Sequence, residues 1–252
     1  MSTPNTLKAA LRRGDRQIGL WLTLASATAT EMAARAGFDW VLIDMEHTVA
    51  SEAEVLEHLR AAVGGTAEPM VRIPWNDAVV FKRVLDIGVR SILVPYVQNA
   101  EEAKQAVAAT RYPPAGIRGF SGMSRANDYA RDVGYAARAS EQIFLAVQIE
   151  SPEAVANAAE IAAIEGIDGV FVGPNDLAAN MGYLGQPNHP EVRKVIADVV
   201  APIRAAGKAA GMLDFNVEGA KAWFDMGFGF IGVGSDSSLL AAGLNGLVKS
   251  YR

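Results

Sequence analysis

The 252-residue sequence contains no cysteine. A chain without thiols forms no disulfide, offers no thiolate to a metal ion and has no cysteine nucleophile. Any metal site in this protein must therefore use oxygen or nitrogen ligands.

Positive charge is not in excess, because 23 Lys and Arg residues stand against 28 Asp and Glu residues, for a net charge of −5. A nucleic-acid surface needs clustered Lys and Arg, so we expect no nucleic-acid partner. Charged or turn-forming residues interrupt every apolar run before it is long enough to span a bilayer. The first residues, Met1 to Lys8, lack the pattern of a signal peptide. We therefore expect a cytoplasmic protein with no membrane partner.

Half of the residues are hydrophobic, which is enough for a large buried core. Eight apolar runs alternate with amphipathic stretches, and every second run begins with a glycine in the position of a helix C′ residue. The runs span residues 18–23, 37–44, 70–74, 88–95, 143–150, 166–173, 208–213 and 227–234. This alternation predicts an α/β fold, a (β/α)8 TIM barrel formed by one domain over residues 1–252. An open, doubly wound sheet is the alternative.

Residues 111–142 do not follow this alternation and are interpreted as an insertion. The stretch from Arg111 to Gly119 is rich in turn residues, and residues 127–139 have the composition of a helix. Long connections on the catalytic side of a barrel often cover the site, so we expect this segment either to cover the site or to contact another subunit.

Two carboxylates follow neighbouring strands of the predicted barrel. Glu150 ends the run 143–150, and Asp176 follows the run 166–173. Between them, Ser151-Pro152-Glu153 has the pattern of a helix start. Glu150 and Asp176 should therefore lie at the carboxyl ends of adjacent parallel strands, where barrel enzymes place their chemistry. Such hard oxygen ligands suggest Mg²⁺ or Mn²⁺, and they discriminate poorly against Co²⁺.

Three more polar residues are expected at the same rim. His47 follows the second strand beside Asp44 and Glu46, which suggests a general base. Arg72 lies within an apolar strand, where it either pairs with a barrel carboxylate or binds an oxyanion of the substrate. Gln148, two residues before Glu150, should share its face of the strand.

The remaining histidines and two further acids receive non-catalytic interpretations. His58 and His189 are expected at the surface. Asp214 and Asp236 are expected to cap helices.

None of the seven lysines follows a predicted strand at its carboxyl end; they are Lys8, Lys82, Lys104, Lys194, Lys208, Lys221 and Lys249. Schiff-base chemistry needs a lysine in the pocket, so that route is closed. Carbanion chemistry in this barrel would have to use a metal ion as the electron sink.

The sequence resembles the HpcH/HpaI aldolase family, and within it the class II pyruvate aldolases of the 4-hydroxy-2-oxoheptane-1,7-dioate type. The resemblance covers nearly the whole chain. The matching stretches are 19–22, 37–47, 71–77, 93–100, 111–119, 147–150 and 173–177.

This resemblance implies a metal-dependent aldolase that cleaves 4-hydroxy-2-oxo acids reversibly to pyruvate and an aldehyde. Glu150 and Asp176 match the family's metal ligands. His47 matches the base that removes the C4 hydroxyl proton, directly or through a water molecule. Arg72 matches the residue that binds the substrate and stabilises the enolate oxyanion.

The resemblance also implies substrate contacts by Gln148, Gly173, Asn175 and Asp176. Relatives often have alanine in place of Asn175, where the contact is made by the backbone amide. Asp86 matches a catalytic acid that acts on the base across a subunit interface. Relatives form hexamers that exchange the C-terminal helix, so a homohexamer is expected here.

Three other functions remain as alternatives. The nearest is a CoA-thioester lyase of the citrate lyase or malyl-CoA lyase type, although the sequence shows no basic cluster for the CoA nucleotide. The second is a non-catalytic barrel that binds an organic acid. The third is an isomerase that binds phosphate at the Gly232-x-Gly234 turn.

Overall fold

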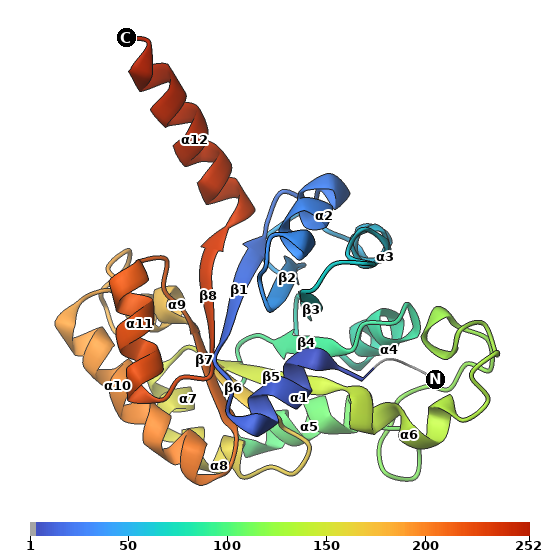
Figure 1. Ribbon diagram of the computed structural model, residues 1–252. Coiled ribbons are helices and arrows are strands. Elements are labelled where there is room, and N and C mark those ends of the chain that lie inside the picture. The colour runs from blue at the N-terminus through green and yellow to red at the C-terminus, as the bar shows by residue number, and fades with distance from the viewer. Residues whose placement is uncertain (1–3) are drawn as a thin grey trace.

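The computed structural model describes residues 4–252, and its eight parallel strands close into a barrel in the order β1 to β8 (Figure 1). The strands are β1 (Gln17–Leu22), β2 (Trp40–Asp44), β3 (Glu68–Arg72), β4 (Ser91–Val94), β5 (Phe144–Ile149), β6 (Gly169–Val172), β7 (Ala209–Leu213) and β8 (Phe230–Ser235). The predicted TIM barrel is confirmed, and the open sheet is wrong because β1 pairs with β8. Residues 1–3, with which the predicted domain begins, lie outside the described residues.

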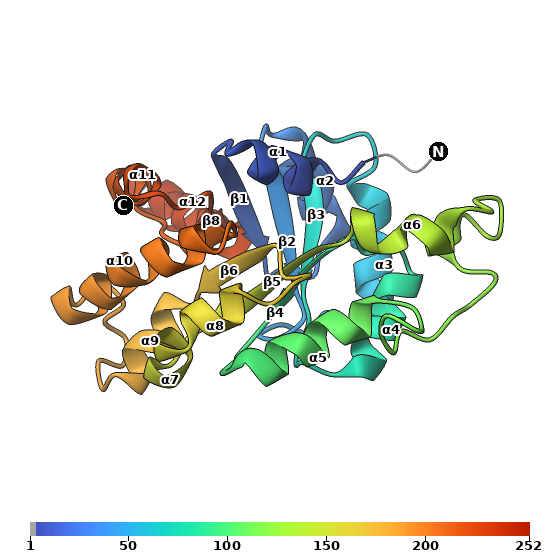
Figure 2. The same ribbon diagram turned by 90° about the horizontal axis from the view of Figure 1, so that it is seen from below.

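Helices surround this barrel, except for the last one, which extends away from it (Figure 2). They are α1 (Thr6–Arg13), α2 (Ala27–Arg35), α3 (Glu52–Ala61), α4 (Ala78–Asp86), α5 (Ala100–Thr110), α6 (Tyr135–Gln142), α7 (Pro152–Ala156), α8 (Ala158–Ala162), α9 (Pro174–Asn180), α10 (Pro190–Ala205), α11 (Val217–Met226) and α12 (Asp236–Ser250), with the 3₁₀ turn η1 (Arg125–Asn127). The repeated glycine before every second strand has a positive φ in all four cases, at Gly37, Gly88, Gly166 and Gly227. This confirms its interpretation as the residue that ends a helix at Gly37, Gly88 and Gly227, but the interpretation is wrong for Gly166, which lies in a turn after Ala163 has capped α8.

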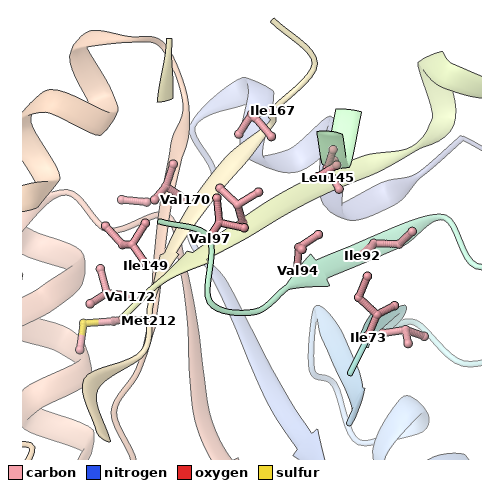
Figure 3. Packing of buried hydrophobic residues seen from close by; sticks show 14 of the residues in the cluster. Ile73, Ile92, Val94, Val97, Leu145, Ile149, Ile167, Val170, Val172 and Met212 are labelled. Carbon is pink, nitrogen blue, oxygen red and sulfur yellow. The ribbon is translucent and has the colours of Figure 1, made fainter. Parts of the chain in front are cut away.

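The core has two layers, which follow from the two faces of each strand. Apolar side chains on the outer face of the strands pack against the helices in one cluster, which includes Val94, Leu145, Val170 and Met212 (Figure 3). Aromatic residues fill the barrel interior, where Trp40, Phe144, Phe171 and Phe230 are almost fully buried. Gly19 makes room for this filling, because a Cβ there would overlap the ring of Trp40. The interior is therefore a packed core, so that chemistry is left to the rim.

The insertion at 111–142 differs from its prediction in both position and content. It follows α5 and precedes β5, so it lies at the amino ends of the strands and does not cover their carboxyl ends. The helix expected over 127–139 is also wrong, because turns follow η1 and α6 begins only at Tyr135. Asp128, Tyr129 and Ala130 all have positive φ, which is incompatible with a helix.

The last helix, α12, extends away from the barrel (Figure 1). None of its residues is buried, although five apolar side chains lie along it: Leu239, Leu240, Leu244, Leu247 and Val248. No helix among residues 4–252 combines the length and apolar character needed to cross a membrane.

Candidate active site

Glu150 follows β5 directly and is buried within the rim formed by the carboxyl ends of the strands, with 2% of its surface exposed. Its Oε1 accepts a hydrogen bond of 2.8 Å from the backbone N–H of Tyr96, and its Oε2 accepts one from the side-chain amide of Gln148. The expectation that Gln148 shares a face with Glu150 is confirmed. The neighbouring strand β6 leads into α9, whose first turn carries Asp176.

Burial and two neighbouring acids shift the pKa of Glu150. Burial raises the pKa of Glu150 to about 7, and the negative charges of Asp176 and Glu46 add to this effect. A carboxyl group held in this way gains most from a positive charge beside it, since a cation would offset both the desolvation and the repulsion.

Gly173, at the junction of β6 and α9, leaves room for this arrangement. A Cβ at Gly173 would overlap Oε2 of Glu150 and would lie 2.9 Å from Nε2 of Gln148. Gly173 has a φ of −88°, so backbone freedom is not the reason for a glycine here. The space above Gly173 is what lets Glu150 and Gln148 meet.

Arg72 ends β3 and is held by carboxylates of the neighbouring strand. Its Nε donates to Oδ1 of Asp44 at 2.9 Å, its Nη2 donates to Oδ2 of the same residue, and its Nη1 lies 3.0 Å from Oε2 of Glu46. Burial disfavours the charged form of Asp44, but the hydrogen bonds and charge of Arg72 outweigh it and lower the pKa of Asp44. The guanidinium carbon also lies 5.4 Å from the ring centre of Trp21. Arg72 therefore forms the ion pair with barrel carboxylates that was one of its two interpretations.

His47 lies on the loop after β2, with 62% of its side chain exposed. Its Nε2 is 3.7 Å from Oε2 of Glu46, the oxygen that also faces Arg72. Burial raises the pKa of Glu46, while Arg72 and His47 oppose the rise. Glu46 thus connects His47 to Arg72, a role that the sequence did not indicate.

The other histidines and acids differ from their predictions in part. His58 is buried and contacts Thr30 Oγ1 through Nδ1, so the expected surface position is wrong. His189 is half-buried and caps α10, where its Nδ1 accepts from Glu191 N. Asp214 and Asp236 cap no helix, because Asn216 and Ser235 occupy the cap positions of α11 and α12.

Asp86 ends α4, on the side of the barrel away from His47 in this chain. Its Oδ1 lies 3.4 Å from Nη2 of Arg118, a fully buried side chain that packs over the rings of Tyr112 and Tyr135. The action of Asp86 on a base across a subunit interface stays a prediction.

Sequence reasoning missed Tyr96, which follows β4. Its φ of 53° is unusual for a residue with a side chain, and this conformation accompanies the N–H bond to Glu150. The Tyr96 ring stacks on Trp75, with ring centres 6.1 Å apart. No residue type in the sequence indicates that Tyr96 adopts a left-handed backbone conformation, so only the structure reveals its hydrogen bond to Glu150.

The chemistry of the donor set decides whether a metal ion fits. Residues 4–252 contain no group of three or more His, Asp or Glu side chains placed to hold a metal. Glu150 and Asp176 follow the neighbouring strands β5 and β6, and Oε1 of Gln148 is buried without a hydrogen-bond partner in the described structure. Mg²⁺ and Mn²⁺ commonly bind through one or two carboxylates and take their other ligands from water or substrate. Glu150 and Asp176 fit such an ion.

Comparisons with known proteins agree with this geometry. The sequence profile of "HpcH/HpaI aldolase/citrate lyase" matches residues 17–242. A 4-hydroxy-2-oxo-heptane-1,7-dioate aldolase from Shigella sonnei is 48% identical over 248 residues, which cover 98% of this chain and 95% of that protein. The protein of the same name from Escherichia coli has the same identity and coverage. A crystal structure of an HpcH/HpaI aldolase/citrate lyase family protein from Burkholderia cenocepacia J2315 superposes with a TM-score of 0.95 at 37% identity, covering 98% of this chain and 99% of that one.

Proposed function

Because this chain belongs to the HpcH/HpaI aldolase/citrate lyase family, we propose that it is a class II pyruvate aldolase, which cleaves 4-hydroxy-2-oxo acids reversibly to pyruvate and an aldehyde. The observation that carries the proposal is the buried carboxylate of Glu150, raised in pKa and flanked by Asp176, on the rim that also carries Arg72 and His47. The name of the Shigella sonnei relative makes 4-hydroxy-2-oxo-heptane-1,7-dioate the first substrate to test.

Glu150 and Asp176 would hold the divalent ion, Mg²⁺, Mn²⁺ or Co²⁺. When bound, the ion supplies positive charge against the oxygens of a 2-oxo acid. Asn175 and Asp176 lie in the first turn of α9, where backbone N–H groups are available to a carboxylate, whereas the N–H of Gly173 donates to the carbonyl of Ile149. A substrate contact at Gly173 would therefore use the open space above its Cα. Gln148, whose buried Oε1 has no hydrogen-bond partner among residues 4–252, would bind the substrate from the adjacent strand.

In the cleavage direction, His47 takes the proton of the C4 hydroxyl. The C3–C4 bond then breaks, its electron pair moves to C3 and the C2 oxygen, and the aldehyde leaves. Arg72 stabilises the negative charge on the enolate oxygen, and a proton delivered to C3 gives pyruvate. Two hydrogen bonds to Asp44 fix the guanidinium plane of Arg72 beforehand, which is the condition under which such a charge contact lowers a barrier most.

We also propose that the protein is a single domain and a homo-oligomer, a hexamer by family resemblance. The support on this chain is α12, whose five apolar side chains are about half exposed. An apolar helix face of this kind marks a protein interface, and exchange of α12 with a second copy would bury it. Asp86 would then act on the His47 of a neighbouring subunit.

The test is pyruvate release from 4-hydroxy-2-oxo acids by the purified protein, with and without a chelator. We expect release that requires a divalent ion and falls strongly in His47→Ala and Arg72→Ala. Full activity in EDTA, or full activity of both variants, would rule the scheme out.

A further inference from the structure

A cavity of about 240 Å³ lies between the carboxyl ends of β6 and β7 and the first turns of α10 and α11. Pro174 and Asn175 form one of its walls, so it lies directly beside Asp176. Its other walls are mostly apolar and are formed by Ile196, Met212, Leu213, Phe215 and Trp223. The proposed mechanism leaves this space without a role.

Among the described residues that line the cavity, Arg193 is the only cation. Its guanidinium carbon lies 4.5 Å from the ring centre of Trp223, and its Nη1 donates to Oδ1 of Asn188 at 3.2 Å. Within residues 4–252, its Nε and Nη2 donate to no hydrogen bond, and 35% of the side chain is exposed. Trp223 and Asn188 thus hold the guanidinium in place, and its Nε and Nη2 remain available to a ligand.

Asp214 lines the same cavity beside Arg193. The closest approach of the two is 3.8 Å, between Nη1 and Oδ2. The oxygens of Asp214 accept from Trp223 Nε1 and from the backbone N–H of Asn216, both at 2.9 Å, and only 10% of the side chain is exposed. Asp214 is therefore held by its own two donors, and its contact with Arg193 is longer than either of these hydrogen bonds.

The amide side chains around Arg193 add donors. Oδ1 of Asn188 accepts from Arg193, and Oδ1 of Asn216 accepts from the backbone N–H of Gly219, so each has its NH₂ group left for a ligand. A mostly apolar cavity that ends in one guanidinium and two amide donors suits an aliphatic chain that ends in a carboxylate.

Resting on the proposed aldolase function, we propose that this cavity binds the part of the substrate beyond C4 and that Arg193 pairs with a carboxylate at its far end. Arg193 is then the residue that selects 4-hydroxy-2-oxo dicarboxylic acids over monocarboxylic ones. The planar guanidinium of Arg193 is already stacked on Trp223 and hydrogen-bonded to Asn188, so it loses little conformational entropy when it binds a carboxylate.

The experiment compares two substrates of equal carbon number, one with a carboxylate at C7 and one with a methyl group there. For Arg193→Gln we expect kcat/KM for the dicarboxylate to fall about 10- to 100-fold, mainly through KM, with kcat/KM for the monocarboxylate unchanged. Arg193→Lys keeps the charge and should retain part of the selectivity. Circular dichroism verifies that each variant is folded.

The matched control is Arg16→Gln. Arg16 also pairs with an aspartate, Asp225 at 3.0 Å, and also lies over an aromatic ring, Phe224 at 5.6 Å, but it is outside the cavity. This control should leave both substrates unaffected. If kcat/KM falls equally for both substrates in Arg193→Gln, or for neither, the assignment of Arg193 is overturned. Pyruvate release by the unmodified protein would still support the aldolase function. Pyruvate from neither substrate with the unmodified protein would overturn both proposals.

Discussion

Asp44 and Arg72 are direct register partners on β2 and β3, and they end their strands joined by two hydrogen bonds. Both side chains are almost fully buried. The register is what brings them together, because a slip of one residue on either strand would turn one side chain to the opposite face of the sheet. The strand pairing of the barrel thus sets the orientation of the guanidinium that we propose for enolate stabilisation.

Removal of Asp44 should therefore cost both stability and activity. In Asp44→Ala the buried charge of Arg72 loses its fork partner, and we expect the free energy of unfolding to fall by about 3 kcal/mol in urea titration. The control is Asp15→Ala, which breaks an exposed pair with Arg13 and should cost less than about 1 kcal/mol. Equal losses of unfolding free energy in the two variants would show that the buried Asp44–Arg72 pair contributes no more to stability than an exposed pair.

A methyl group at Gly173 should weaken metal binding without unfolding the protein. In Gly173→Ala the new Cβ overlaps Oε2 of Glu150, so the carboxylate must turn away from Gln148. We expect the affinity for Mn²⁺, measured by calorimetry, to fall by about 10- to 100-fold.

Gly234→Ala is the control for this substitution. Gly234 lies on β8, where an added Cβ has an ordinary contact of 3.4 Å with Leu20, so the affinity for Mn²⁺ should not change. Unchanged affinity in Gly173→Ala would mean that Glu150 is not a ligand, or that it binds from another rotamer.

The raised pKa of Glu150 predicts how the stability of the metal-free protein depends on pH. The carboxyl group has a pKa of about 7 when folded and an ordinary value of 4.5, so the folded state holds a proton that the unfolded chain releases. This contribution is complete below the ordinary pKa and is lost as the pH rises through about 7. Between about pH 5 and about pH 8, the Tm of the metal-free protein should therefore fall relative to that of Glu150→Gln.

Mn²⁺ should raise the Tm of the unmodified protein at the upper end of this range and leave Glu150→Gln unaffected. Glu160→Gln removes the same charge from an exposed position and should respond to Mn²⁺ as the unmodified protein does. A Glu150→Gln variant that is stabilised by Mn²⁺ as strongly as the unmodified protein would contradict the proposed ligand role.

The sequence contains enough information for the barrel because every strand is marked by an apolar run and every second strand is also preceded by a glycine. The continuous apolar run indicates a strand buried on both faces, and the glycine ends the preceding helix at Gly37, Gly88 and Gly227. The neighbouring positions of Glu150 and Asp176 follow from the same alternation, since consecutive parallel strands end at one rim.

Contacts that depend on rotamers or on rare backbone conformations could not be predicted in this way. Glu46 facing both Arg72 and His47 depends on side-chain torsions, and Tyr96 binds Glu150 through a left-handed backbone that no residue type announces. His58 resembled a surface residue because charged neighbours flank it in sequence, yet its face of α3 packs against Thr30 of α2. The length of the insertion is typical of a segment that covers an active site, but its place between α5 and β5 puts it at the amino ends of the strands, and the alternative, a contact with another subunit, stays a prediction.

The last helix should be the main determinant of assembly. Leu240 and Leu244 lie one turn apart on α12 and are 52% and 55% exposed. In the double variant Leu240→Asp with Leu244→Asp, two carboxylates enter the face that we propose is buried by another copy, and we expect a smaller species in analytical ultracentrifugation. The barrel itself should stay folded by circular dichroism, because α12 contributes no buried residue to it.

Asn245→Asp is the control for this double variant. It places a charge at an exposed polar position of the same helix and should leave the assembly intact. An unchanged sedimentation coefficient for the double variant would show that α12 holds no subunits together, and the action of Asp86 across an interface would then need a contact elsewhere on the barrel.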